Sequence, residues 1–342
     1  MRRFWIWGLV CVAGTALAAA ALLASFRLRF PISDAAEPLL IGLGLAGGAW
    51  HYHRRGVPQF ALALGALLFI TTFSACYSVL MYAAAASGRG LADGWLQATD
   101  AALGVHLPSI VRWTQEHPAI GRGLRFAYDS LLWQTPLVII VLSFGRRDRE
   151  LRGFVVQFMM AALVCAAVFV ALPADGPFAA YGYPADATQA RYLEHFHELR
   201  AGERTTATWR GAEGLITFPS FHTTWAILLF WAVRQRRGLR IVSGALNLAV
   251  IASTMTTGWH YFSDVLGGVA VAVGAILLER PIWDWCERQS RRDLETLLRR
   301  GLIPQPGIVA EPSIVATDNA TADSNEDDLE PVGAGAAGIA AR

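Results

Sequence analysis

The sequence contains no lysine, so all 29 of its basic residues are arginine. Charged residues of any kind are scarce, at 16% of 342 residues, whereas a soluble domain usually has about one quarter. Hydrophobic residues make up 54% of the chain, and the net charge is only +2. This composition excludes an ordinary soluble domain and indicates a membrane protein. Because no basic recognition motif accompanies the arginines, we expect no nucleic-acid partner.

Cysteine is also rare, and the four cysteines form no CxxC pair. They lie in apolar runs or on the predicted cytoplasmic side, so we expect neither disulfides nor thiol chemistry. The sequence likewise lacks a P-loop, a GxGxxG turn and an HExxH metal motif. Nucleotide-binding and zinc-protease functions therefore have no support in the sequence.

Apolar runs dominate what is present. A transmembrane helix needs about 20 apolar residues. The longer runs are therefore long enough to cross the membrane alone, and the shorter ones must include flanking residues to do so. We predict an all-α polytopic membrane protein, a bundle of about six to eight transmembrane helices with its active site at the outer membrane face. The eight runs are 5–26, 39–50, 57–86, 131–144, 154–172, 221–233, 241–257 and 265–278.

The arginines predict the topology, because short cytoplasmic loops collect positive charge. Arginine clusters fall at every second boundary between runs, so we expect both termini in the cytoplasm and the segments 87–130, 173–220 and 258–263 outside. The first apolar run, near 22 residues, is longer than the roughly 7 to 15 of a signal peptide, which favours an uncleaved span. The lack of lysine suggests a GC-rich bacterial genome, which would place the protein in the inner (plasma) membrane and its site in the periplasm.

The segments between the runs predict five regions. The outer segment has helical spacing broken at Gly-Val-His-Leu-Pro, which predicts two amphipathic helices within 91–130. The outer loop 173–220 is rich in turn residues and too long to be a simple connection, so we expect it to be functional. The regions are N-terminal helices 1–86, the outer segment 87–130, a phosphatase-like or phosphotransferase-like core 131–282, a cytoplasmic helix 283–302 and a disordered tail 303–342.

Two short stretches carry the candidate chemistry: TFPSFHTTW, residues 217–225, and HYFSD, residues 260–264. One helical hairpin separates His222 from His260, and at about 1.5 Å per residue its two helices return the chain to the same membrane face. Asp264 follows His260 by one helical turn, within reach of its ring. The sequence therefore predicts a cluster of two histidines and one aspartate at the outer face.

Such a cluster suits phosphoryl transfer. A carboxylate that fixes one imidazole nitrogen leaves the other as an oriented nucleophile, and a second, protonated histidine can act as general acid. Ser220 is a favoured N-cap, and a helix start binds phosphate. Taken singly, each has an ordinary alternative: an interfacial histidine can be structural, HxxxD arises by chance, and Ser220 can be a cap and nothing more.

FPSFH followed by HYFSD resembles the second and third motifs of the type 2 phosphatidic acid phosphatase (lipid phosphate phosphatase) superfamily, Pro-Ser-Gly-His and Ser-Arg-x5-His-x3-Asp. With Phe in place of Gly, it is more similar to the inositol phosphorylceramide synthase-like (inositolphosphotransferase) branch. The resemblance covers roughly residues 130–280. It implies that His260 forms a phosphohistidine, Asp264 orients it, His222 protonates the leaving alcohol, and no metal or other cofactor is needed. Tyr261, inside the motif, is a further candidate for substrate binding.

The sequence departs from this family at its cations. The third-motif arginine is replaced by Thr254, and the first motif, Lys-x6-Arg-Pro, is replaced by PADGPF, which has no cation and includes Asp175. Phosphoryl transfer needs positive groups around the phosphate oxygens. We therefore expect another outer arginine to bind the phosphate, Arg200 first and Arg210 second, together with Ser220.

These observations predict an integral membrane lipid phosphatase or phosphotransferase that acts on a phospholipid or polyprenyl (di)phosphate at the outer leaflet. The missing cations keep a second hypothesis open, a catalytically weakened protein that binds lipid phosphates or serves as a scaffold. A transporter is less supported, since none of the well-defined spans has an acidic residue in its middle. The sequence does not indicate an oligomeric state.

Overall fold

The computed structural model describes residues 2–183, 186–208 and 214–299. Two compact units divide the chain, Met1–Cys286 and Glu287–Arg342, and the fold discussed below is that of the first. The helices are α1 (Arg2–Ser25), α2 (Ile32–Arg54), α3 (Pro58–Ala85), α4 (Asp93–Ala102), α5 (Leu107–Glu116), α6 (Pro118–Asp129), α7 (Leu131–Phe144), α8 (Asp148–Ala171), α9 (Pro177–Ala180), α10 (Ala187–Ala201), α11 (Phe221–Val233), α12 (Arg237–Thr256) and α13 (Phe262–Arg299).

Each of the eight apolar runs forms a helix, and the predicted all-α polytopic membrane fold is confirmed. Within the described residues, five helices are long and apolar enough to cross a membrane, namely α1, α3, α8, α12 and the part of α13 up to Asp284. A sixth is reached if α6 and α7, which meet at a bend of 50°, form one span. At 13 residues α11 is apolar but short, so the lower end of the predicted range fits best.

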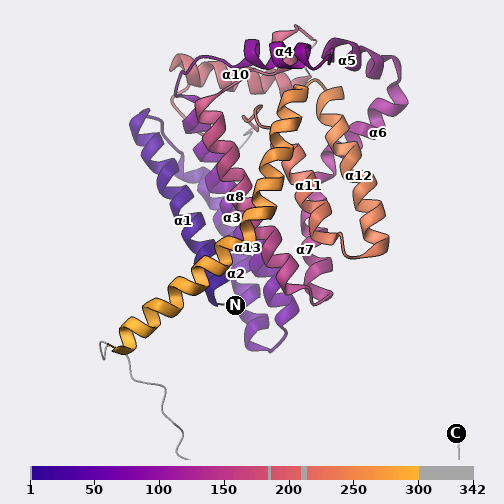
Figure 1. Ribbon diagram of the computed structural model, residues 1–342. Helices are drawn as coiled ribbons and strands as arrows, with labels where there is room; N and C mark the ends of the chain where they lie inside the picture. Colours follow the sequence, from indigo (N-terminus) through magenta and orange to yellow (C-terminus); the bar gives the residue numbers. More distant parts are fainter. Residues whose placement is uncertain (1, 184–185, 209–213, 300–342) are drawn as a thin grey trace, which may run out of the picture. The chain divides into compact units, whose positions relative to one another are not determined.

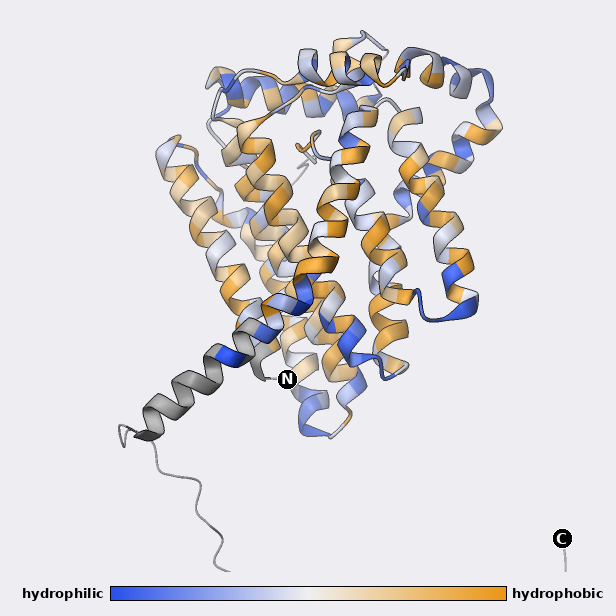
Figure 2. Ribbon diagram, in the orientation of Figure 1, coloured by the Kyte–Doolittle hydropathy of each residue, from blue (hydrophilic) through white to orange (hydrophobic). Residues whose placement is uncertain are grey.

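The long helices pack side by side through aromatic and small residues. Figure 2 shows hydrophobic residues along the middle of these helices and hydrophilic residues at both ends of the bundle. Between α1 and α3, the rings of Phe4 and Phe69 meet edge to face, with 5.6 Å between their centroids. Further in, Phe158 of α8 packs edge to face against Phe221 and Trp225 of α11. Burial of these large apolar side chains holds α11, and with it the second motif, against the core.

A layer of short helices lies across one end of the bundle. Figure 1 shows α4, α5 and α10 over this end, which we call the capped end. The prediction of two amphipathic helices in 91–130 was wrong, because Pro118 starts a third helix, α6, directly after α5. Pro is tolerated at the first position of a helix, where its missing N–H costs no hydrogen bond.

The second outer segment also contains more structure than its turn residues suggest. Helix α10 begins at a capping box in which the Asp186 side chain accepts the Gln189 N–H and the Gln189 side chain accepts the Asp186 N–H. Gly202 ends it in a left-handed conformation with φ of 75°. Both are standard helix boundary signals, so this helix was recognisable in the sequence.

The C-terminal boundaries differ from those predicted. The region predicted as a cytoplasmic helix, 283–302, begins inside α13, which extends unbroken from Phe262 to Arg299. The remainder of that region and the predicted tail, 303–342, lie outside the described residues.

Candidate active site

His260 lies at the capped end, in the short turn between α12 and α13, and is almost completely buried, with 2% of its surface exposed. Its Nδ1 lies 2.9 Å from the Thr217 carbonyl oxygen and 3.3 Å from Oδ2 of Asp264. Because a carbonyl oxygen can only accept, Nδ1 carries the proton and donates it. The other nitrogen, Nε2, then has a free lone pair whose direction is fixed by these two acceptors.

His222 stands in the first turn of α11, facing His260. The two imidazole centroids are 5.8 Å apart, as expected if one hairpin returns the chain to the same face. The ring of His222 stacks on that of Tyr128 at 4.4 Å, and the Tyr128 hydroxyl lies 3.4 Å from His222 Nδ1. Helix α6 thus holds the orientation of the second histidine.

Ser220 caps the helix that carries His222. Its hydroxyl oxygen accepts the Thr223 N–H at 3.2 Å, which is the N-cap role predicted from the sequence. Its own backbone N–H donates to the Asp264 carbonyl oxygen at 3.0 Å. The second and third motifs are therefore joined directly, through the residue before α11 and the first turn of α13.

Helices α11 and α13 meet at unusually short range just below the site. Thr224 Oγ1 donates to the Gly268 carbonyl oxygen at 2.9 Å. A Cβ added at Gly268 would stand 2.5 Å from the Ser220 carbonyl oxygen and 2.9 Å from Cβ of Thr223, closer than real side chains approach. Glycine at this position is what allows the helices carrying His222 and His260 to come together.

Asp264 holds the turn as well as the imidazole. Its Oδ2 accepts the Tyr261 N–H at 2.9 Å in addition to facing His260 Nδ1. Its Oδ1 is buried and has no hydrogen-bond partner among the described residues. The carboxylate is fully enclosed, so its interaction with His260 is little screened by water.

Two aspartates of α4, Asp93 and Asp100, complete the support of this turn, and the sequence analysis did not identify them. The Asp100 carboxylate accepts the Phe262 and Ser263 N–H groups, both at 2.8 Å, and so caps α13 from outside. The Asp93 carboxylate accepts the Tyr261 hydroxyl at 2.9 Å. Asp93 and Asp100 are seven residues apart, two turns along one helix face, which is the signal that could have revealed them.

Asp93 also binds two residues that the sequence singled out, Tyr261 and Asp175. The Tyr261 side chain is buried with its hydroxyl on Asp93 and within 3.5 Å of the Gln97 side-chain nitrogen. Asp93 further accepts the backbone N–H groups of Asp175 and Gly176, at 2.8 and 2.9 Å. The PADGPF loop is thereby anchored to α4.

Arg200, the first sequence candidate for phosphate binding, lies beside this loop. It donates to the Arg89 carbonyl oxygen, and its guanidinium stands 5.2 Å from the Phe196 ring centroid. Its Nη1 is buried without a hydrogen-bond partner among the described residues. Arg210, the second candidate, lies outside the described residues.

Two further arginines, Arg122 and Arg125 of α6, line a cavity of about 300 Å³ at the capped end. Thr256 and Thr257, from the end of α12 that leads into the His260 turn, form part of its wall. Arg125 is one turn from Tyr128, the residue stacked on His222, and pairs with Asp186 at 3.2 Å. These arginines therefore lie near the end of α12 that leads to His260, on the helix whose Tyr128 stacks on His222.

Burial changes the proton affinities of the groups around the turn. It lowers the pKa of His260 from 6.5 to about 4, against the opposing effect of the Thr217 carbonyl. It raises the pKa of the Asp175 carboxyl, which His197 and Arg200 partly offset by their positive charge. His197 Nε2 lies 3.4 Å from Asp175 Oδ1, so a histidine ring stands beside the carboxyl of the PADGPF loop.

The fold and the site define a class: a helical membrane protein whose buried histidine and aspartate face a second histidine at one end of the bundle. The chain belongs to the PAP2 superfamily, which it matches over residues 94–278, more than half of its length. The match begins at α4, well before the region expected from the motifs alone, so α4, α5 and α6 are part of the family unit. No curated protein and no solved structure is significantly similar to the chain.

Proposed function

We propose that the protein is a lipid phosphatase or phosphotransferase that works through a phosphohistidine on His260. Membership of the PAP2 superfamily fits this activity in general. The observation that carries the proposal is the hydrogen bonding of His260, whose Nδ1 proton is held by Thr217 and Asp264 while Nε2 keeps its lone pair. This is the tautomer that attack on phosphorus requires.

In the first step, His260 Nε2 attacks the phosphorus atom and the bond from phosphorus to the leaving oxygen breaks. His222, 5.8 Å away between centroids, protonates the departing alcohol. In the second step, His222 takes a proton from water or from an acceptor alcohol, which attacks phosphorus and releases His260. Water as acceptor gives hydrolysis, and an alcohol gives transfer, as in the inositolphosphotransferase-like branch that the motifs resemble.

For the phosphate oxygens, we propose Arg200 and Arg125 as the cations in place of the family arginine that Thr254 replaces. Arg200 is supported by its buried, unpartnered Nη1 and its position beside the PADGPF loop. Arg125 is supported by its position one turn from Tyr128 and in the wall of the outer cavity. Arg210 and Ser220 remain proposed substrate contacts, while we assign the Tyr261 hydroxyl to positioning of the turn, because it is bound to Asp93.

The substrate that we propose is a phospholipid or polyprenyl (di)phosphate in the outer leaflet of the plasma membrane, with both termini in the cytoplasm. This rests on the arginine distribution and on the position of the site at one end of a membrane bundle. The site lies among the ends of apolar helices, at the level where lipid headgroups are found.

A catalytically weakened lipid-phosphate-binding protein remains the second candidate, favoured by the absence of an arginine at Thr254. A substrate panel separates the two. Detergent-solubilised protein is incubated in EDTA with phosphatidate, isoprenyl diphosphate and phosphatidylinositol, beside His260→Ala. If the protein is an enzyme, it releases or transfers phosphate only when His260 is intact. Binding of lipid without turnover of any substrate supports the second candidate. Equal rates in wild type and His260→Ala overturn the mechanism.

A further inference from the structure

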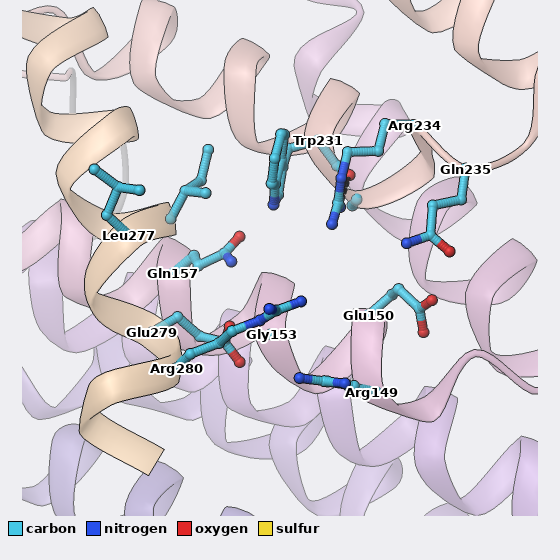
Figure 3. Close-up of a pocket in the computed structure, with 12 residues that line it drawn as sticks. Arg149, Glu150, Gly153, Gln157, Trp231, Arg234, Gln235, Leu277, Glu279 and Arg280 are labelled. Carbon is cyan, nitrogen blue, oxygen red and sulfur yellow. Dashed lines mark hydrogen bonds between the residues drawn. The ribbon is translucent and has the colours of Figure 1, made fainter. Parts of the chain in front are cut away.

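A second cavity, of about 570 Å³, lies between α8, α11 and α13 at the end of the bundle away from His260 (Figure 3). Helices α11 and α13 both begin beside the histidines and reach this cavity at their far ends. Since a helix rises about 1.5 Å per residue, roughly 20 Å separate it from His222. The proposed reaction uses none of the residues that line it.

Positive charge dominates this cavity. Figure 3 shows the guanidinium groups of Arg149, Arg234 and Arg280 directed into a shared space from three helices. Glu279 of α13 also lines the cavity, and its carboxylate is close enough to interact with the charges of all three arginines. The other carboxylate, Glu150, is paired with Arg147 at 3.3 Å. Three guanidinium groups therefore share the cavity with two carboxylates, one of which, Glu150, is paired with an arginine outside the lining.

One of the three arginines is held rigidly. The Arg234 guanidinium lies over the Trp231 indole, 3.6 Å from its centroid, and Nη1 donates to the Trp231 carbonyl oxygen at 2.5 Å. A guanidinium fixed in this way loses little conformational entropy when it binds an anion. On the opposite wall, Gly153 leaves room beside Glu279, since an added Cβ would lie 3.4 Å from its Oε1.

The cavity continues into an apolar, outward-facing surface. Ile276 and Leu277 line it on the α13 side, and Leu277 and Leu278 are 66% and 53% exposed. Trp231, at the end of an apolar helix, is of the kind that marks a membrane interface. A site with phosphate-binding groups on one side and lipid-facing leucines on the other matches an amphiphile better than a soluble nucleotide.

We propose that this cavity binds the headgroup phosphate of an anionic phospholipid, in the leaflet opposite the catalytic site. Guanidinium groups bind phosphate through paired hydrogen bonds, and basic pockets between membrane helices are known hosts of anionic headgroups. Gln157, which also faces the cavity, offers a neutral donor to the headgroup. The lipid is bound and not converted, because the described lining residues include no histidine, cysteine, serine or threonine.

The test uses the purified full-length protein with equimolar phosphatidylglycerol and phosphatidylcholine, with bound lipid measured by native mass spectrometry. The variant is Arg149→Gln with Arg280→Gln, which leaves the Arg234 contact to α11 intact. The matched control, Arg237→Gln with Arg240→Gln, removes the same charge from exposed positions on α12. Arg200→Gln with Arg125→Gln, which removes the two proposed phosphate ligands of the catalytic site, separates this lipid from one bound there.

We expect wild type, the α12 control and Arg200→Gln with Arg125→Gln to retain phosphatidylglycerol. The cavity variant should bind it roughly 30-fold more weakly, at about 1 kcal/mol per arginine. Excess inorganic phosphate should not displace the lipid. Equal retention by the cavity variant, or an equal loss in the α12 control, would overturn the proposal. Displacement by inorganic phosphate would also overturn it, by showing a site for the free anion.

Discussion

Oδ1 of Asp100 accepts the Ser263 backbone N–H at 2.8 Å, across 163 residues of sequence. The same carboxylate also accepts the neighbouring N–H of Phe262 at 2.8 Å. A helix of the capping layer therefore holds the first turn of α13, immediately after the proposed nucleophile. The superfamily match likewise begins in α4, the helix that carries Asp100.

Asp100→Ala should destabilise the protein and abolish most of its activity. Removing the acceptor leaves a buried and a partly buried N–H group without their partner, at up to about 1–3 kcal/mol each. It also releases the turn that positions His260. Thermal unfolding and lipid phosphate release measure the two effects. Asp129→Ala, an exposed aspartate of α6, is the control. If Asp100→Ala behaves like this control, α4 does not support the site.

Gly268→Ala should separate the two histidines. The added methyl group would clash with the Ser220 carbonyl oxygen and Thr223, and overpacking of this kind costs about 1–3 kcal/mol. Activity should fall by at least tenfold as α11 moves away from α13. Gly274→Ala, on the same helix with nothing within 4 Å of an added Cβ, should leave activity unchanged, and an equal loss in both variants would contradict the close-approach argument.

The pH dependence should reflect the buried His260. Its pKa is lowered from 6.5 to about 4, so Nε2 stays unprotonated, and able to attack, as the pH falls through 6. The acidic limb of the rate should therefore lie near pH 4. A phosphodiester lipid is the appropriate substrate, because a phosphomonoester titrates itself near pH 6. An acidic limb close to 6.5 in single-turnover rates would show that His260 is not desolvated.

Arg200→Gln and Arg125→Gln test the proposed cations. Loss of a group that stabilises charge in the transition state commonly costs about 100-fold in kcat, so a variant that lowers kcat to this extent identifies the phosphate ligand. Arg240→Gln, exposed near the start of α12 and so at the end of that helix away from the His260 turn, is the control for charge. Wild-type kcat and KM in both variants would remove both residues from the site.

The juxtaposition of His222, His260 and Asp264 followed from the sequence, because the lengths of two apolar helices determine where a hairpin returns. The role of Asp100 did not follow, since it depends on how α4 docks on α13, a contact between segments far apart in the chain. An acidic residue on an amphipathic helix also resembles an ordinary solvated position. Helix α10 is a different case: its capping box at Asp186 and Gln189 was present in the sequence, but the surrounding turn residues obscured it.

The most direct test of the central claim is trapping of the covalent intermediate. Wild type, His222→Ala and His260→Ala are incubated with a lipid carrying labelled phosphate, quenched in alkali and assayed for protein-bound, acid-labile label. The account predicts phosphohistidine in wild type, mapped to the peptide containing His260, and none in His260→Ala. Label of equal amount in His260→Ala would contradict it.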